Sequence, residues 1–231
     1  MQRPVLAGFF GKIPATGDFV GRGLPVSFVQ PWELWAAEAL RQSRALLGDA
    51  WLEAWLVAPV WRFRLPAGAC GPDAALGLVL PSIDRVGRAW PLVVAFVLQR
   101  SGFKPALRLR HMVAPATAGI DASAGTNTGV DGGPPPAMTV EGSASDGEAD
   151  AFDPLLANAE ATAREAIAED MQPDAFAARL QGLPGRHFVT LPQQSARWWT
   201  HGGPNVAPQS LTLAGLPAMP QFAGLLAGER G

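Results

Sequence analysis

Two uninterrupted apolar runs, residues 76–80 and 92–98, dominate the hydrophobic pattern of this chain. Both are rich in valine and leucine, and neither alternates apolar with polar residues. A strand covered on one face shows such an alternation, whereas a short continuous run is typical of a strand buried on both faces. The pattern therefore predicts two adjacent strands at the centre of the fold.

The segment between these runs, residues 81–91, is dense in charged residues and turn formers. It is longer than the roughly 2–5 residues that a tight hairpin requires. A polar loop that is longer than its connection requires, and that is held by a rigid pair of strands, is a common location for functional residues. The alternative is that Asp84 pairs locally with Arg85 or Arg88 and only makes the turn soluble, because such surface ion pairs are common.

Other segments predict the elements around this pair of strands. Residues 5–10 form a short apolar strand, and residues 61–65 alternate strictly, which predicts a strand whose Arg62 and Arg64 face solvent. We expect a break before Pro31, because proline suits the first turn of a new helix. Apolar stripes at helical spacing and helix-ending Gly or Pro residues predict helices over residues 25–47, 50–57, 153–170, 173–182 and 221–227.

Residues 114–150 have a different composition from the rest of the chain. They consist of Gly, Ala, Ser, Thr, Pro and Asp with almost no large apolar side chain. Burial of apolar surface cannot offset the entropy of ordering such a segment, so we predict a disordered low-complexity insertion. The remainder of residues 1–231 is expected to form a single domain.

Composition excludes several classes of function. The formal net charge of −2 gives no support for nonspecific nucleic-acid binding. No apolar run approaches the ~18 residues of a membrane span, so no membrane insertion is expected. The single cysteine, Cys70, rules out an internal disulfide framework. These features predict a soluble cytoplasmic protein.

Three local patterns invite a chemical interpretation. Gly11-Lys12 suggests a phosphate-binding P-loop, but Leu6 replaces the required earlier glycine and Ile13 replaces the hydroxyl residue after the lysine. Cys70 has no protease signature around it and is expected to be a buried, unreactive thiol. Trp198 and Trp199 are adjacent, so in a strand they point to opposite faces and each needs its own cover or a partner.

Motifs on both sides of the polar insertion carry a resemblance to a known family. They are GFFGKIP (8–14), GDF (17–19), PSIDRVGR (81–88), WPL (90–92), WWT (198–200) and GLP (215–217). With these motifs in this order, the chain resembles the TagF family, also called ImpM, which are accessory proteins of bacterial type VI secretion systems. Residues 114–150 do not follow the pattern of the family.

The resemblance implies a fold and a role. The fold is an α/β three-layer sandwich with a central, largely antiparallel sheet covered by helices on both faces. The role is post-translational repression of secretion by binding a forkhead-associated scaffold protein (Fha), in a pathway with a threonine kinase and with a PP2C-type phosphatase as a second partner. It implies no catalytic residues, cofactor or metal.

Two alternatives rest on the loops 11–18 and 81–91. A hydrolase or transferase would use Lys12, Asp18, Asp84 and Arg85, yet Ser82 is the only hydroxyl residue of the hairpin loop and no histidine accompanies it. A phosphopeptide-binding module would rest on Arg85 and Arg88 with Lys12 or Arg22, because guanidinium groups fit phosphate oxygens. We favour the non-enzymatic regulator. Its candidate partner-binding residues are Lys12, Asp18, Asp84, Arg85, Arg88, Trp198 and Trp199.

Overall fold

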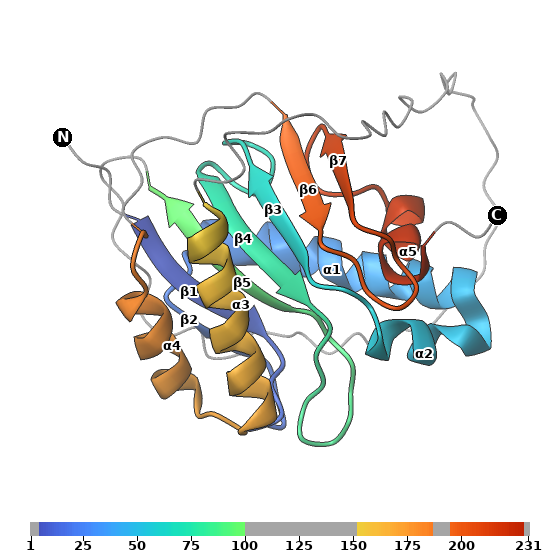
Figure 1. Cartoon of the computed structure of the whole chain (residues 1–231), viewed down its shortest axis with the longest axis horizontal. Coiled ribbons are helices and arrows are strands. Elements are labelled where there is room, and N and C mark those ends of the chain that lie inside the picture. Colours follow the sequence, from blue (N-terminus) through green and yellow to red (C-terminus); the bar gives the residue numbers. More distant parts are fainter. Residues whose placement is uncertain (1–4, 100–151, 187–194, 229–231) are drawn as a thin grey trace, which may run out of the picture.

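A computed structural model describes residues 5–99, 152–186 and 195–228 (Figure 1). Its elements are β1 (Val5–Gly11), β2 (Val20–Arg22), α1 (Val26–Leu47), a 3-10 turn (Gly48–Ala50), α2 (Trp51–Leu56), β3 (Trp61–Leu65), β4 (Ala74–Leu80), β5 (Leu92–Leu98), α3 (Asp153–Ala168), α4 (Pro173–Gly182), β6 (Ala196–Thr200), β7 (Gln209–Leu213) and α5 (Met219–Ala227). The insertion predicted at residues 114–150 lies outside the described residues.

The strands of the described residues form one sheet with the order β2-β1-β5-β4-β3-β6-β7. Each neighbouring pair is antiparallel. The two predicted central strands are β4 and β5, which pair from Ala74↔Leu98 to Leu80↔Leu92. Their side chains are buried along almost the whole length. This confirms the prediction drawn from the two apolar runs.

Helices cover both faces of the sheet, as Figure 1 shows with α3 and α4 in front and α1 behind. On the face of α1, α2 and α5, Trp32, Phe63 and Trp198 belong to one apolar cluster. On the opposite face, Phe176 of α4 packs with Phe9 of β1 in a second cluster. The architecture is therefore the predicted α/β sandwich of three layers.

Strand β3 differs from its prediction. Arg62 and Arg64 were expected to face solvent, but their exposed fractions are only 6% and 4%. The reason is that α3 covers this side of the strand, and its Glu160 forms an ion pair with Arg62 and a second one with Arg164. Alternation correctly placed the arginines on one face, but it could not show that a helix from much later in the chain would cover that face.

Helix α1 also differs, because it continues through Pro31 without a break. A proline inside a helix removes one backbone hydrogen bond, here the bond to the carbonyl of Ser27. Packing offsets that loss: Trp32 is fully buried, and Trp35 donates its indole N–H to the carbonyl of Pro217 at 2.8 Å. Gly71 fits tightly against this turn, since an added Cβ would lie 2.1 Å from the Ser27 oxygen.

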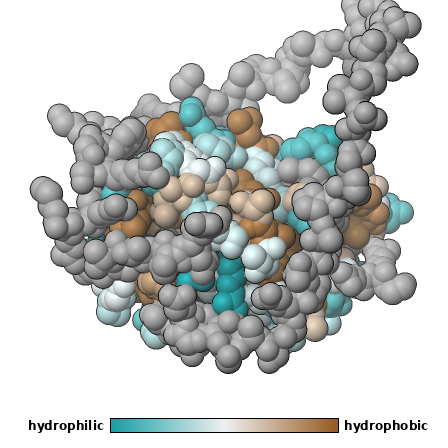
Figure 2. Space-filling model, turned by 90° about the horizontal axis from the view of Figure 1, so that it is seen from above, coloured by the Kyte–Doolittle hydropathy of each residue, from teal (hydrophilic) through white to brown (hydrophobic). Residues whose placement is uncertain are grey.

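The loop between β4 and β5 extends beyond one end of the sheet, at the bottom of Figure 1. Figure 2 looks onto the opposite end, where the visible described residues mix hydrophobic and hydrophilic side chains. Within the described ranges, no helix has the length and apolar character needed to cross a bilayer.

Candidate functional site

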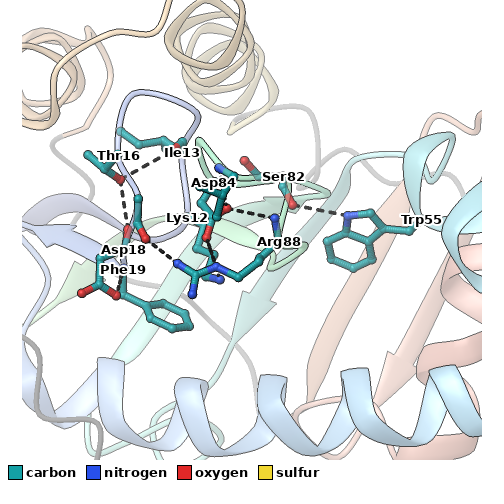
Figure 3. A network of polar contacts seen from close by, with 11 residues as sticks. Lys12, Ile13, Thr16, Asp18, Phe19, Trp55, Ser82, Asp84 and Arg88 are labelled. Atoms are coloured by element: carbon teal, nitrogen blue, oxygen red, sulfur yellow. Dashed lines mark hydrogen bonds and ion pairs between the residues drawn. The ribbon is translucent and has the colours of Figure 1, made fainter.

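Asp84 is the centre of the loop between β4 and β5, and its side chain is completely buried (Figure 3). Its Oδ2 atom lies 3.0 Å from Nζ of Lys12 and 2.7 Å from Nε of Arg88. The Lys12 side chain is itself only 8% exposed, although the Arg88 side chain is largely exposed. The fold therefore brings together three of the predicted candidate residues from the two loops.

The backbone of the same loop holds the other carboxylate oxygen. Oδ1 of Asp84 accepts the N–H groups of Val86 at 3.0 Å and Arg88 at 2.9 Å. Burial by itself raises the pKa of this carboxyl, but the hydrogen bonds from Arg88, Lys12 and Val86 outweigh burial. They hold the pKa of Asp84 well below its usual range, because each of them favours the charged form.

Further contacts tie this loop to the segment after β1. The backbone N–H of Arg85 donates to the carbonyl of Thr16 at 2.8 Å, and the Arg88 guanidinium donates to the carbonyl of Gly17. Asp18 stays exposed, and its carboxylate accepts the N–H of Phe19. Asp18 thus shapes its own turn and lies outside the buried ion pairs.

The expected local pairing of Asp84 is present, and it involves Arg88 rather than Arg85. Because the Asp84 carboxylate is buried, these ion pairs do more than make the turn soluble. Without them, a charged carboxylate would be buried without a partner, which is strongly unfavourable. The role of Asp84 and Lys12 visible here is to fix the geometry of the loop.

Ser82 lies at the base of the loop. Its carbonyl accepts the indole N–H of Trp55 at 3.3 Å and the backbone N–H of Trp90 at 3.0 Å. Its hydroxyl is buried and finds no hydrogen-bond partner among the described residues, so no base activates it there. Among all residues that the structure describes, no group of three or more His, Cys, Asp or Glu side chains could hold a metal ion.

The outer side of the loop is formed by residues 85–88, which we call the loop tip. All four residues are exposed, and Val86 is 67% exposed. Within residues 5–99, 152–186 and 195–228, the Arg85 guanidinium pairs with no carboxylate. From the sequence, Arg85 and Arg88 were equivalent candidates, because spacing alone cannot show which arginine pairs with Asp84. The sequence analysis did not identify Val86 as a candidate.

Trp198 and Trp199 do not join the loop tip. They point to opposite faces of the sheet, as the sequence predicted, and both are covered: Trp198 is 0% and Trp199 is 9% exposed. Neither ring is presented to a partner in this fold. The structure thus buries both rings, Trp198 in the cluster on the face of α1, α2 and α5 and Trp199 in the cluster on the opposite face, and their choice as partner-binding residues stays a prediction.

Cys70 is buried, with Sγ 3.6 Å from the carbonyl oxygen of Phe28. Burial raises the pKa of its thiol to about 12. Since only the thiolate is a good nucleophile, this cysteine is protonated and unreactive at neutral pH.

We expect Cys70→Ala to leave the function of the protein unchanged. We also expect a thiol reagent at pH 8 to modify the native protein slowly and the unfolded protein rapidly, because both burial and the raised pKa suppress the thiolate. Loss of function in a Cys70→Ala variant that melts like the parent would contradict this assignment and would favour the enzymatic interpretation.

Fold and site together define a class: a three-layer α/β sandwich in which a projecting loop is fixed by buried ion pairs. The model of the TagF N-terminal domain, described as type VI secretion system-associated, matches residues 8–122. The chain belongs to the TagF family, and it is a protein associated with type VI secretion.

A solved structure is similar along nearly the whole chain. The crystal structure of PA0076 from Pseudomonas aeruginosa PAO1 is similar, with 27% sequence identity and a TM-score of 0.69. The similarity covers 97% of this chain and 96% of that one. A search of curated proteins gave no match.

Proposed function

We propose that this protein is a non-enzymatic, cytoplasmic repressor of type VI secretion that acts after translation by binding the forkhead-associated scaffold Fha. The main observation behind this proposal is that the charged residues around the loop between β4 and β5 stabilise the loop itself. Lys12 and Arg88 are paired with the buried Asp84, while Arg85 and Val86 of the exposed loop tip are left for contacts with another molecule. Membership of the TagF family supports the link to the secretion system.

The enzymatic alternative has weaker support. General acid–base or nucleophilic catalysis needs a nucleophile within reach of a base. The hydroxyl of Ser82 makes no hydrogen bond in the described part of the chain, and Lys12 is engaged with Asp84. The residues named for a hydrolase therefore do not meet as a catalytic group.

A phosphopeptide-binding module is also less well supported. It would need several cations converging on one phosphate. Arg88 is engaged with Asp84 and with the carbonyl of Gly17, and Lys12 is buried beneath them. Arg22 forms an ion pair with Asp174 of α4. Arg85 alone is a modest basis for recognising a phosphate group.

The proposal is tested by measuring binding of the purified chain to purified Fha by titration calorimetry, and by measuring secretion after deletion of the gene. We expect a complex with a dissociation constant in the micromolar range or tighter, which corresponds to about −8 kcal/mol. We also expect higher secretion in the deletion strain, with repression restored by the intact chain. The PP2C-type phosphatase is titrated in parallel as the second proposed partner. Absence of binding to Fha, or unchanged secretion in the deletion strain, would refute the proposal.

A further inference from the structure

We infer that the loop tip is the contact surface for the scaffold, with the Arg85 guanidinium binding a carboxylate on an acidic patch of that partner and Val86 packing beside it. This inference rests on the proposed function, because it names the site through which the repressor binds. It divides the two arginines of the loop into different roles: Arg88 fixes the loop, and Arg85 contacts the partner.

The first support is that the loop tip has a fixed backbone. Arg85 donates its N–H to Thr16, and Gly87 donates its N–H to the carbonyl of Asp84 at 2.9 Å. Gly87 has φ +82°, a conformation that favours glycine and closes the turn. The buried carboxylate of Asp84 holds the remaining N–H groups. A surface that is ordered before binding loses little conformational entropy on association.

The second support is charge. In the described chain many arginines have a carboxylate partner, namely Arg22, Arg41, Arg62, Arg88, Arg164 and Arg179. The side chain of Arg85 lies next to Gly17, where an added Cβ would be 3.6 Å from Nη2, and it forms no ion pair within the described residues. An exposed guanidinium without a counter-charge can take one from a partner.

The third support is the combination of side chains. Arginine is enriched among the interface residues that contribute most of the binding energy. The exposed Val86 beside it adds apolar surface that a partner can bury. A guanidinium can bind a carboxylate through two parallel hydrogen bonds. A phosphate carries up to two negative charges and would draw on more cations, but Arg88 and Lys12 already neutralise Asp84. We therefore assign a carboxylate as the partner group.

The experiment compares four chains in binding to Fha produced without its kinase: wild type, Arg85→Glu, Arg85→Lys and the control Arg41→Glu. Arg41 is another exposed arginine, but it lies on α1 and pairs with Glu38. We expect Arg85→Glu to weaken binding at least about 30-fold, the scale of a major interface residue. Arg85→Lys should weaken binding less, since it keeps the charge and loses the two-pronged geometry. Arg41→Glu should bind like wild type.

Thermal unfolding of the same preparations keeps the result interpretable, because Arg85→Glu should melt within a few degrees of wild type. If wild type binds neither unphosphorylated nor kinase-phosphorylated Fha, the proposed function fails. If wild type binds and a folded Arg85→Glu variant binds equally well, this inference fails while the proposed function stands. If only kinase-phosphorylated Fha binds, and Arg85→Glu abolishes that binding, the assignment to a carboxylate is overturned in favour of a phosphate.

Discussion

Replacing Asp84 by Asn should lower the free energy of unfolding by about 3–5 kcal/mol, the usual cost of removing one member of a buried ion pair. The asparagine has nearly the same shape and can still accept the N–H groups of Val86 and Arg88. The substitution instead leaves the ammonium group of Lys12 buried without its negative partner. Chemical denaturation followed by tryptophan fluorescence measures the change.

Asp18→Asn is the matched control. It makes the same chemical change at an exposed carboxylate of the adjoining loop, which accepts the N–H of its neighbour Phe19. We expect a change of at most ~0.5–1 kcal/mol there. The double variant Lys12→Met/Asp84→Asn should regain part of the loss, because the unpaired buried charge is gone. An Asp84→Asn variant as stable as Asp18→Asn would show that the buried ion pair does not stabilise this fold.

The contribution of Asp84 should depend on pH in a defined direction. Its folded-state pKa lies below that of an unfolded aspartate, about 4. The charged form is therefore favoured by folding, and its contribution is fully present above about pH 5. As the pH falls below 4 toward the folded-state pKa, the stability difference between wild type and Asp84→Asn should shrink. A difference that grew in acid would contradict the assigned direction.

Replacing Trp198 by Ala should also cost about 3–5 kcal/mol, which is typical of removing a fully buried aromatic side chain. Trp198 is 0% exposed, and its ring lies 5.1 Å from the ring of Phe63 and 6.4 Å from that of Trp32. Its indole N–H donates to the carbonyl of Gly215 at 3.2 Å. Removal leaves a cavity between β6 and α1 that this packing cannot easily close.

Trp198→Phe and Leu34→Ala serve as controls for this experiment. The first keeps most of the buried aromatic surface and should cost less than the alanine variant. The second removes a leucine that is 74% exposed and should change stability by less than ~0.5 kcal/mol. A Trp198→Ala variant that melted like wild type but failed to bind Fha would instead place this residue in the partner interface.

The family and the central strands could be predicted from the sequence because both depend on local pattern. The uninterrupted apolar character of β4 and β5 already requires cover on two faces. The adjacency of Trp198 and Trp199 requires opposite directions in a strand, whatever the rest of the chain does. The length of the loop between β4 and β5 likewise marked it as more than a turn.

The state of each candidate residue could not be predicted in the same way. Whether a polar residue faces water depends on elements that arrive from distant parts of the chain. Arg62 is buried by α3, which begins at Asp153, and Lys12 becomes the partner of Asp84 only because β1 and β5 are neighbours in the sheet. The spacing of residues along the chain shows neither the burial of Arg62 nor the pairing of Lys12 with Asp84.

The sequence by itself therefore determined the buried strands, the opposite directions of the paired tryptophans and the resemblance to TagF, since strand periodicity and motif order are properties of short segments. Tertiary structure alone decided that Arg88 fixes the loop while Arg85 remains exposed, and that both tryptophans are covered. The physical reason is that ion pairing and burial depend on distances in space. Folding places Nζ of Lys12 3.0 Å from Oδ2 of Asp84, although the two residues lie in different loops.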